Sequence, residues 1–359
     1  MLNLAGLTPI GVRYADEGPR LQWRVNGAIV ETDFDRFRPA QIVRLPESDG
    51  IRVIWRDFYD LPMTDPFFHF AQDFAAAMPQ RSGIFQTDLD VVERVAGLPD
   101  TMPFSGAVFH MARTGSTLVH RLLSATGKVM SLSEVPMVNQ ALERAAGLPE
   151  AQRAHALNIL VRSYGRARRP SEEHLVIKMQ DATPSNQLPV FRAAFPDTPW
   201  IFIYRDPVEV MVSLLRKPSG SMGQWFRNRA AAARNLGMPL LSRGDIWPEE
   251  YLARTLRRFC ESAADTANAT PPGRFLAISY RRLPEAVWES IGPHFGIDFT
   301  EKDREAMRAA ARFSAKSTET VEFKPDSEGK HKEAGPRVRK LAERLVAPMI
   351  RRLEALPQG

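Results

Sequence analysis

The sequence predicts an α/β protein with a mainly parallel sheet flanked by helices, preceded by a small β-rich region. Four apolar runs after about residue 104 lack two-residue alternation, as strands buried on both faces do. They cover residues 107–111, 175–179, 200–204 and 275–279. Helix-like stretches separate them, for example residues 117–125, and this order of elements is typical of α/β folds.

The first hundred residues have a different pattern. Residues 21–25 alternate apolar and polar side chains and lead into Asn26-Gly27, with residues 28–30 as the returning strand. Alternation around Asn-Gly is typical of a β-hairpin, because both turn positions tolerate positive φ. Residues 51–55 are expected to add a third strand. A helix is expected over residues 65–78, with a proline at its first position.

The change of pattern near Leu98-Pro99 marks a predicted domain boundary. We predict an accessory region over residues 1–98 and a main domain over residues 99–359. The last element of the main domain is expected to be a basic amphipathic helix over residues 337–356, kinked or split at Pro348 because proline cannot continue the backbone hydrogen bonds.

The composition excludes several classes of protein. Of the 359 residues, 44% are hydrophobic and 25% are charged, which is ordinary for a globular protein. No apolar run approaches the ~20 residues of a membrane helix, and the N-terminal residues lack the pattern of a signal peptide. The one cysteine, Cys260, cannot form an internal disulfide, and no Cys/His cluster has metal-ligand spacing. We expect a soluble, cytoplasmic protein without a metal site.

The charge balance is compatible with an anionic ligand but does not require one. There are 48 Lys and Arg residues against 42 Asp and Glu, for a net charge of +6. Such an excess suits nucleic acid, an acidic membrane or small polyanions, and it is equally compatible with a solvated surface. Aromatic residues do not interleave with the basic clusters as they do on nucleic-acid stacking surfaces. Small phosphorylated molecules are therefore favoured over nucleic acid.

The first of the four apolar runs leads into a loop suited to a phosphate group. Residues 112–117 read Ala-Arg-Thr-Gly-Ser-Thr and precede a helix. A strand-to-helix turn of this kind directs backbone N–H groups toward one point at a helix N-terminus. It is not a Walker A loop, because eight residues separate Gly106 from Gly115 and no lysine precedes Ser116.

The third apolar run leads into a second candidate anion site. Asp206, Pro207 and Glu209 give a well-specified helix start, with Asp206 as the N-cap. Arg205 then lies at the carboxyl end of a strand and Ser213 about two turns into the helix. Ligands of open α/β sheets bind beyond those strand ends, where a guanidinium and a hydroxyl can hold a phosphate.

Together the two segments resemble the sulfotransferases that use 3′-phosphoadenosine 5′-phosphosulfate (PAPS). That family has a phosphosulfate loop of the form Pro-Lys/Arg-Ser-Gly-Thr-Thr, which residues 112–117 match with two Ser/Thr exchanges and Ala112 in place of proline. Its 3′-phosphate motif, Arg-x-Pro-x-Asp/Glu-x-x-x-Ser, is matched in full by residues 205–213. The resemblance is good over residues 104–215 and implies a P-loop-like sheet.

The resemblance also implies roles for individual residues. A Tyr-x-x-Leu segment near the adenine is matched at Tyr280, and a late basic segment closing over the 3′-phosphate is matched at residues 328–332. The implied cofactor-binding residues are Arg113, Thr114, Gly115, Ser116, Thr117, Arg205, Ser213, Tyr280, Lys330 and Lys332.

The implied catalytic residues are Glu134, Lys178 and Arg113. Lys178 matches the lysine of the family's Lys-Thr-His run, but Gln180 occupies the position of the histidine and cannot accept a proton at neutral pH. Many bacterial and peptide-tyrosine sulfotransferases look similar in having a glutamate after the first helix of the fold. Glu134 is therefore the candidate base, with Asp181 as the alternative.

Two other functions stay open at this point. A P-loop kinase using ATP and Mg²⁺ would need a Walker lysine and an acidic metal ligand, for which Asp181 and Asp206 are the only candidates at strand ends. A non-catalytic nucleotide- or peptide-binding protein could use the same fold. The favoured function is transfer of a sulfuryl group from PAPS to a hydroxyl or amine of a small-molecule or peptide acceptor, whose identity the sequence does not reveal. The oligomeric state is equally open.

Overall fold

The computed structural model describes most of the chain. The described residues are 11–15, 18–25, 27–33, 36–44, 51–58, 61, 63–77, 84–98, 101–144, 149–166, 169–181, 187–218, 223, 226–235, 246–313 and 327–359.

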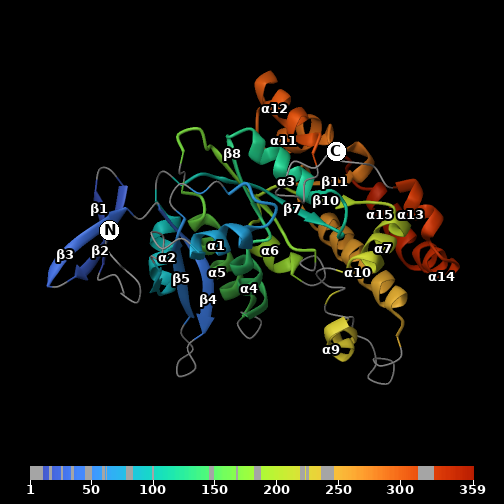
Figure 1. Ribbon diagram of the computed structural model, residues 1–359, viewed down its shortest axis with the longest axis horizontal. Coiled ribbons are helices and arrows are strands. Elements are labelled where there is room, and N and C mark those ends of the chain that lie inside the picture. The colour runs from blue at the N-terminus through green and yellow to red at the C-terminus, as the bar shows by residue number, and fades with distance from the viewer. Residues whose placement is uncertain are drawn as a thin grey trace.

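A five-stranded parallel sheet forms the centre of the molecule (Figure 1). Its strands lie in the order β11-β10-β7-β9-β8, and every adjacent pair is parallel. The bounds are β7 Phe104–His110, β8 Val129–Ser133, β9 His174–Lys178, β10 Trp200–Tyr204 and β11 Phe275–Ser279. The predicted fold class and its four apolar strands are confirmed. Strand β8 lies at one end of the strand order and was not predicted.

Helices cover both faces of this sheet. On one face, Val108 and Ile203 pack with side chains such as Leu122 of α3. On the other, the Phe109 ring packs edge-on against Phe191 of α6, with centroids 5.0 Å apart. The helices are α3 Ser116–Ala125, α4 Pro136–Arg144, α5 Glu150–Ser163, α6 Leu188–Ala194, α7 Pro207–Arg216, α9 Arg229–Asn235, α10 Pro248–Asn268, α11 Gly292–His294, α12 Glu301–Ala311 and α13 Ser327–Glu333, with short helical turns η6 Tyr280–Arg282 and η7 Val287–Ile291.

The N-terminal region contains two small antiparallel sheets. The predicted hairpin is confirmed as β2 Gly18–Val25 and β3 Ala28–Asp33, joined in one sheet by β1 Gly11–Ala15. Residues 51–55 form a strand, as expected, but this strand lies outside the hairpin sheet. They belong to β5 Ile51–Asp57, which pairs with β4 Phe37–Arg44 and β6 Ile84–Thr87 in the second sheet.

Two helices complete this region. Helix α1 spans Phe68–Ala77, so it begins later than predicted, and Met78 lies outside the described residues. Helix α2, Leu89–Ala96, was not predicted and packs against α5. The boundary near residue 98 stays a prediction, although apolar side chains from both sides of it share one buried core.

The C-terminal helix is interrupted near Pro348, as predicted. Helix α14, Pro336–Leu341, passes through a π-helical turn, η8 Ala342–Val346, into α15 Ala347–Glu354. Within the described part of the chain, no helix combines the length and apolar character needed to cross a membrane.

The segment before α1 is attached to the main sheet by hydrogen bonds at buried positions. Ser133 Oγ donates to the Pro66 carbonyl at 2.7 Å. His120 Nε2 lies 2.8 Å from the Asp65 carbonyl oxygen, and His120 Nδ1 lies 2.9 Å from Ser131 Oγ. These contacts fix the segment beside α3 and the carboxyl end of β8.

Burial of His120 is expected to make folding stability depend on pH. Desolvation lowers the pKa of His120 from 6.5 to about 4, despite hydrogen bonds from the ring to backbone carbonyls. The unfolded chain therefore binds a proton more readily than the folded one. His120 alone should lower the free energy of unfolding by about 3 kcal/mol as the pH falls from 6.5 to 4.

Urea unfolding of the His120→Gln variant at several pH values tests this. The variant should lose that part of the pH dependence. His155→Gln is the matched control, because His155 is exposed and should leave the profile unchanged. An unaltered pH profile in the His120 variant would contradict the prediction.

Candidate functional site

Each strand of the parallel sheet ends at a predicted site position. Across the sheet from β11 to β8 these positions are Tyr280, Arg205, the loop 112–117, Lys178 and Glu134. Parallel strands bring their carboxyl ends to one edge, which is where open α/β sheets bind ligands. The structure thus brings together residues that lie far apart in the sequence.

The loop 112–117 has the geometry of an anion-binding turn. Gly115 has φ of 79° and is the N-cap of α3. A Cβ atom at Gly115 would approach Tyr280 Cδ2 to 3.1 Å and Leu283 Cδ1 to 2.9 Å, so both the conformation and the space favour glycine. Thr114 is fully buried, and its Oγ1 has no hydrogen-bond partner among the described residues. A buried hydroxyl of this kind is available to a ligand.

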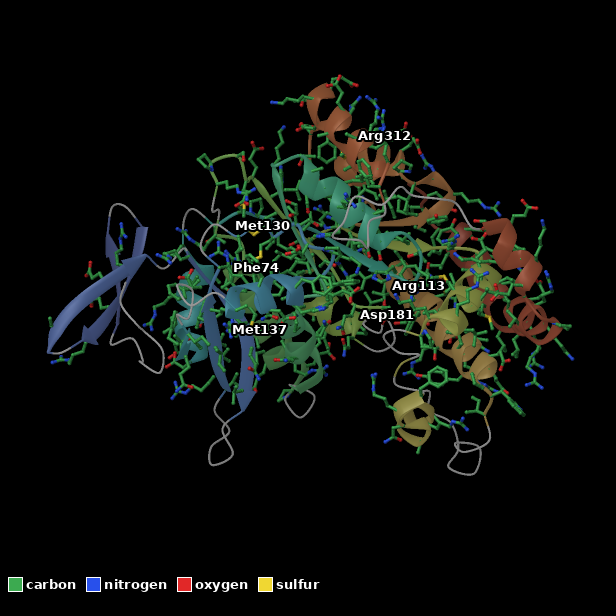
Figure 2. The ribbon with its side chains drawn as sticks, viewed as in Figure 1. Phe74, Arg113, Met130, Met137, Asp181 and Arg312 are labelled. Atoms are coloured by element: carbon green, nitrogen blue, oxygen red, sulfur yellow. The ribbon has the colours of Figure 1, made fainter. Side chains whose placement is uncertain are left out.

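Arg113 also adopts a left-handed conformation, with φ of 59°. Its Nη2 donates to the Lys217 carbonyl at 2.7 Å, while its Nε has no partner within the described structure. Burial lowers the pKa of Arg113, and the nearby Asp181 carboxylate opposes this effect. Figure 2 labels both residues in the same part of the molecule. A partly desolvated guanidinium interacts strongly with an incoming anion.

Arg205 forms hydrogen bonds and a ring contact with residues from several elements of the site. Its Nη1 donates to the Arg113 carbonyl at 3.3 Å, and its Nε donates to Glu209 at 2.7 Å. Its guanidinium lies 3.9 Å from the centre of the Tyr280 ring. The same ring borders the space beside Gly115, where an added Cβ atom would meet it. Arg205 therefore joins the two predicted anion sites.

Helix α13 closes this part of the site. Ser327 Oγ donates to Glu209 at 2.9 Å and accepts from Arg205 Nη2 at 3.2 Å. Burial alone raises the pKa of Glu209, but the hydrogen bonds from Arg205 and Ser327 outweigh it and hold the pKa below its usual value. His331 Nε2 lies 3.6 Å from carboxylate oxygens of both Asp206 and Glu209. No sequence motif indicated Ser327, which directly precedes the matched basic segment 328–332.

Asp206, Glu209 and His331 each offer one potential metal-ligand atom, and these atoms lie within 4.8 Å of one another. Asp206 also caps α7, accepting from the N–H groups of Val208 and Glu209 at 2.9 and 3.1 Å. The contacts of Ser327 and His331 with Glu209 join this polar cluster to α13.

Lys178 and Glu134 form an ion pair at the other end of the site, with the lysine buried and the glutamate partly exposed. Lys178 is 1% exposed, and its Nζ binds Glu134 Oε1 and lies 3.4 Å from Ser133 Oγ. Glu134 has φ of 54° and its N–H donates to the Lys178 carbonyl at 2.8 Å. The Glu134 side chain is 24% exposed, so this carboxylate lies between a buried cation and solvent.

Two non-glycine residues in the described part of the chain have positive φ, and they are Arg113 and Glu134. This conformation is unfavourable by about 1–2 kcal/mol for residues with a Cβ atom. Such outliers concentrate at functional sites, where surrounding contacts enforce them. The backbone therefore singles out two residues that the sequence predicts to be catalytic.

The remaining predicted site residues differ in their exposure to solvent. Ser213 is half-buried on α7. Lys330 is 4% exposed on α13, whereas Lys332 is 76% exposed and pairs with Glu328 at 2.6 Å. Ser116 and Thr117 are buried in the first turn of α3. Phe67, which no motif indicated, lies with its ring centre 5.3 Å from Lys178 Nζ.

Comparison with known proteins identifies the class to which this fold and site belong. A model of the sulfotransferase family matches residues 108–301, which is more than half of the chain. The protein therefore belongs to the sulfotransferase family. A search of curated protein sequences finds no significant match.

Remote structural similarity extends to several sulfotransferases. A sulfotransferase domain from the olefin synthase of Synechococcus PCC 7002 is 17% identical, with 71% of this chain and 95% of that chain covered and a TM-score of 0.41. The domain from the curacin biosynthetic pathway is 12% identical, covering 68% and 98%, with a TM-score of 0.42. A sulfotransferase from Alicyclobacillus acidocaldarius is 14% identical, covering 70% and 95%, with a TM-score of 0.39.

Proposed function

We propose that this sulfotransferase uses PAPS as donor and transfers its sulfuryl group to a hydroxyl or amine of a small-molecule or peptide acceptor. One observation carries the proposal. Arg205, the loop 112–117 and the Lys178–Glu134 pair follow adjacent strands at one edge of the sheet. That edge offers cationic groups for two separate phosphates and a carboxylate for the acceptor proton.

The residues at the loop fit the donor's 5′-phosphosulfate. The backbone N–H groups at the start of α3 offer hydrogen bonds to anionic oxygens. So does the Thr114 hydroxyl, which has no partner among the described residues. Arg205 and Ser213 would hold the 3′-phosphate, with Lys330 and Lys332 nearby on α13, and Tyr280 would lie beside the adenine. When bound, PAPS supplies an activated sulfuryl group on a phosphate leaving group.

The chain's own residues would then move a proton and offset charge. The acceptor oxygen or nitrogen forms a bond to sulfur while the sulfur–oxygen bond to the 5′-phosphate breaks, giving adenosine 3′,5′-bisphosphate. Glu134 takes the acceptor proton. Arg113 and Lys178 stabilise negative charge developing on the departing phosphate oxygen, as preorganised donors do. Asp181 is the alternative base.

Ligand-dependent thermal stability tests the donor assignment. Adenosine 3′,5′-bisphosphate at 100 to 1,000 times its Kd should stabilise the protein by about 3–4 kcal/mol, because it binds the folded state only. Adenosine 5′-phosphosulfate, which lacks the 3′-phosphate, should stabilise it less at the same concentration. Greater stabilisation by ATP with Mg²⁺ would favour a kinase instead. Bisphosphate binding without turnover of PAPS in a broad acceptor mixture would favour a non-catalytic binding protein.

A further inference from the structure

Helix α1 carries aromatic side chains on its exposed face. Phe68, Ala71 and Ala75 point into the core and are at most 3% exposed, whereas Phe70 is 38% and Phe74 is 51% exposed. Exposed large apolar side chains are few in the described structure, and these two lie four residues apart on one helix face. An exposed apolar patch of this kind often marks a ligand or partner site.

This aromatic face is continuous with the catalytic pair. Phe67 lies directly before α1, and its ring is 5.3 Å from Lys178 Nζ. The Phe67 ring packs edge-on against Phe70 at 5.8 Å and stacks on His69 at 5.7 Å. Phe67, Phe70 and Phe74 follow helical spacing, so they form a strip about 10 Å long that starts at Lys178.

The strip is held in place by the main domain. Ser133, next to Glu134 in the sequence, donates to the Pro66 carbonyl, and the buried His120 contacts the Asp65 carbonyl. Hydrogen bonds therefore hold the residues just before α1 against the end of β8. Figure 2 labels Phe74 on this helix, away from Arg113 and Asp181. An apolar body lying on the strip would place its end group beside Lys178 and Glu134.

We infer that the strip of Phe67, Phe70 and Phe74 is an acceptor subsite for an elongated apolar alcohol or phenol. This inference rests on the proposed function and specifies its acceptor. The hydroxyl would lie at Glu134, the first ring would contact Phe67, and the far end would pack on Phe70 and Phe74. Aromatic rings contribute large apolar contact areas with little loss of side-chain freedom.

Two alcohols with the same reacting group and different lengths test the subsite. With PAPS as donor, 4-phenylbenzyl alcohol should have a higher kcat/KM than benzyl alcohol. The ratio of the two values should fall about tenfold in Phe74→Ala, because the second ring loses its apolar contact. Ile29→Ala is the matched control, since Ile29 is 58% exposed on β3 of the separate N-terminal sheet, and its ratio should not change.

Direct binding separates this inference from the proposed reaction. Equilibrium dialysis of 4-phenylbenzyl alcohol should show about tenfold weaker binding to Phe74→Ala than to the wild type, whether or not PAPS is turned over. Equal binding to both proteins, or a preference for glucose over 4-phenylbenzyl alcohol, would overturn the subsite. Loss of PAPS turnover with intact, Phe74-dependent alcohol binding would overturn the proposed reaction and leave the subsite supported.

Discussion

Replacing Arg205 by alanine is expected to weaken binding of adenosine 3′,5′-bisphosphate by on the order of 2–4 kcal/mol. The guanidinium is 8% exposed, and charge-assisted hydrogen bonds from a desolvated cation to a phosphate are the strong ones. Binding of adenosine 5′-phosphosulfate should barely change, because it has no 3′-phosphate. Isothermal titration calorimetry with both ligands measures the difference.

Arg205 also supports the structure, so the experiment needs controls. Its removal leaves Glu209 buried without its main partner, which destabilises the fold through an uncompensated charge. The double variant Arg205→Ala/Glu209→Gln removes that charge and should show the same loss of affinity for the bisphosphate, with binding of adenosine 5′-phosphosulfate again unchanged. Arg257→Ala, on the exposed face of α10, should change neither affinity. Equal losses for both ligands in the double variant would show that Arg205 acts through the fold.

The sequence predicts the strands whose apolar residues follow one another without interruption. The four strands with continuous apolar runs are buried on both faces, and their pattern follows directly from that burial. Strand β8 reads Val-Met-Ser-Leu-Ser, and its two serines break the apolar run. Both serines are nevertheless buried, because Ser131 contacts His120 and Ser133 contacts the segment before α1.

Strand pairing was harder to predict than strand location. Residues 51–55 are extended as expected, but their partner β4 contains Pro39 beside an irregularity in the register, a pattern that weakens the strand signal. The first strand of the hairpin sheet, β1, likewise precedes the region with clear alternation. Partner choice depends on contacts between distant segments, which periodicity alone does not describe.

The sequence offers candidate site residues by their type and position, but it does not predict the geometry in which the structure places them. Arg113 and Glu134 give no sign in the sequence of their left-handed conformations. The contact of Ser327 with Arg205 joins residues 122 positions apart. Phe67 belongs to the predicted accessory region yet lies beside Lys178. Such contacts follow from tertiary packing, so a sequence motif can name the residues but not their partners.

Replacing Glu134 by glutamine is expected to lower kcat by about 10²–10⁴-fold, the usual contribution of a general base. The substitution keeps the shape of the side chain and an oxygen that can accept a hydrogen bond from Lys178, but it removes the ability to take a proton. Lys178 therefore keeps a partner at its buried position. Affinity for adenosine 3′,5′-bisphosphate should stay unchanged, because Glu134 is not placed at either phosphate.

Two further variants make the assignment specific. Glu173→Gln is the matched control: Glu173 is exposed at the opposite end of β9, and its replacement should leave kcat unchanged. Asp181→Asn should lower kcat less than Glu134→Gln if Glu134 is the base. The measurement is steady-state turnover of PAPS with the best acceptor from a panel of alcohols, phenols and amines. Near-full turnover of Glu134→Gln, combined with a large loss in Asp181→Asn, would move the role of base to Asp181. Near-full turnover of both variants would mean that the acceptor reacts without a carboxylate base, as an amine already deprotonated at the working pH would.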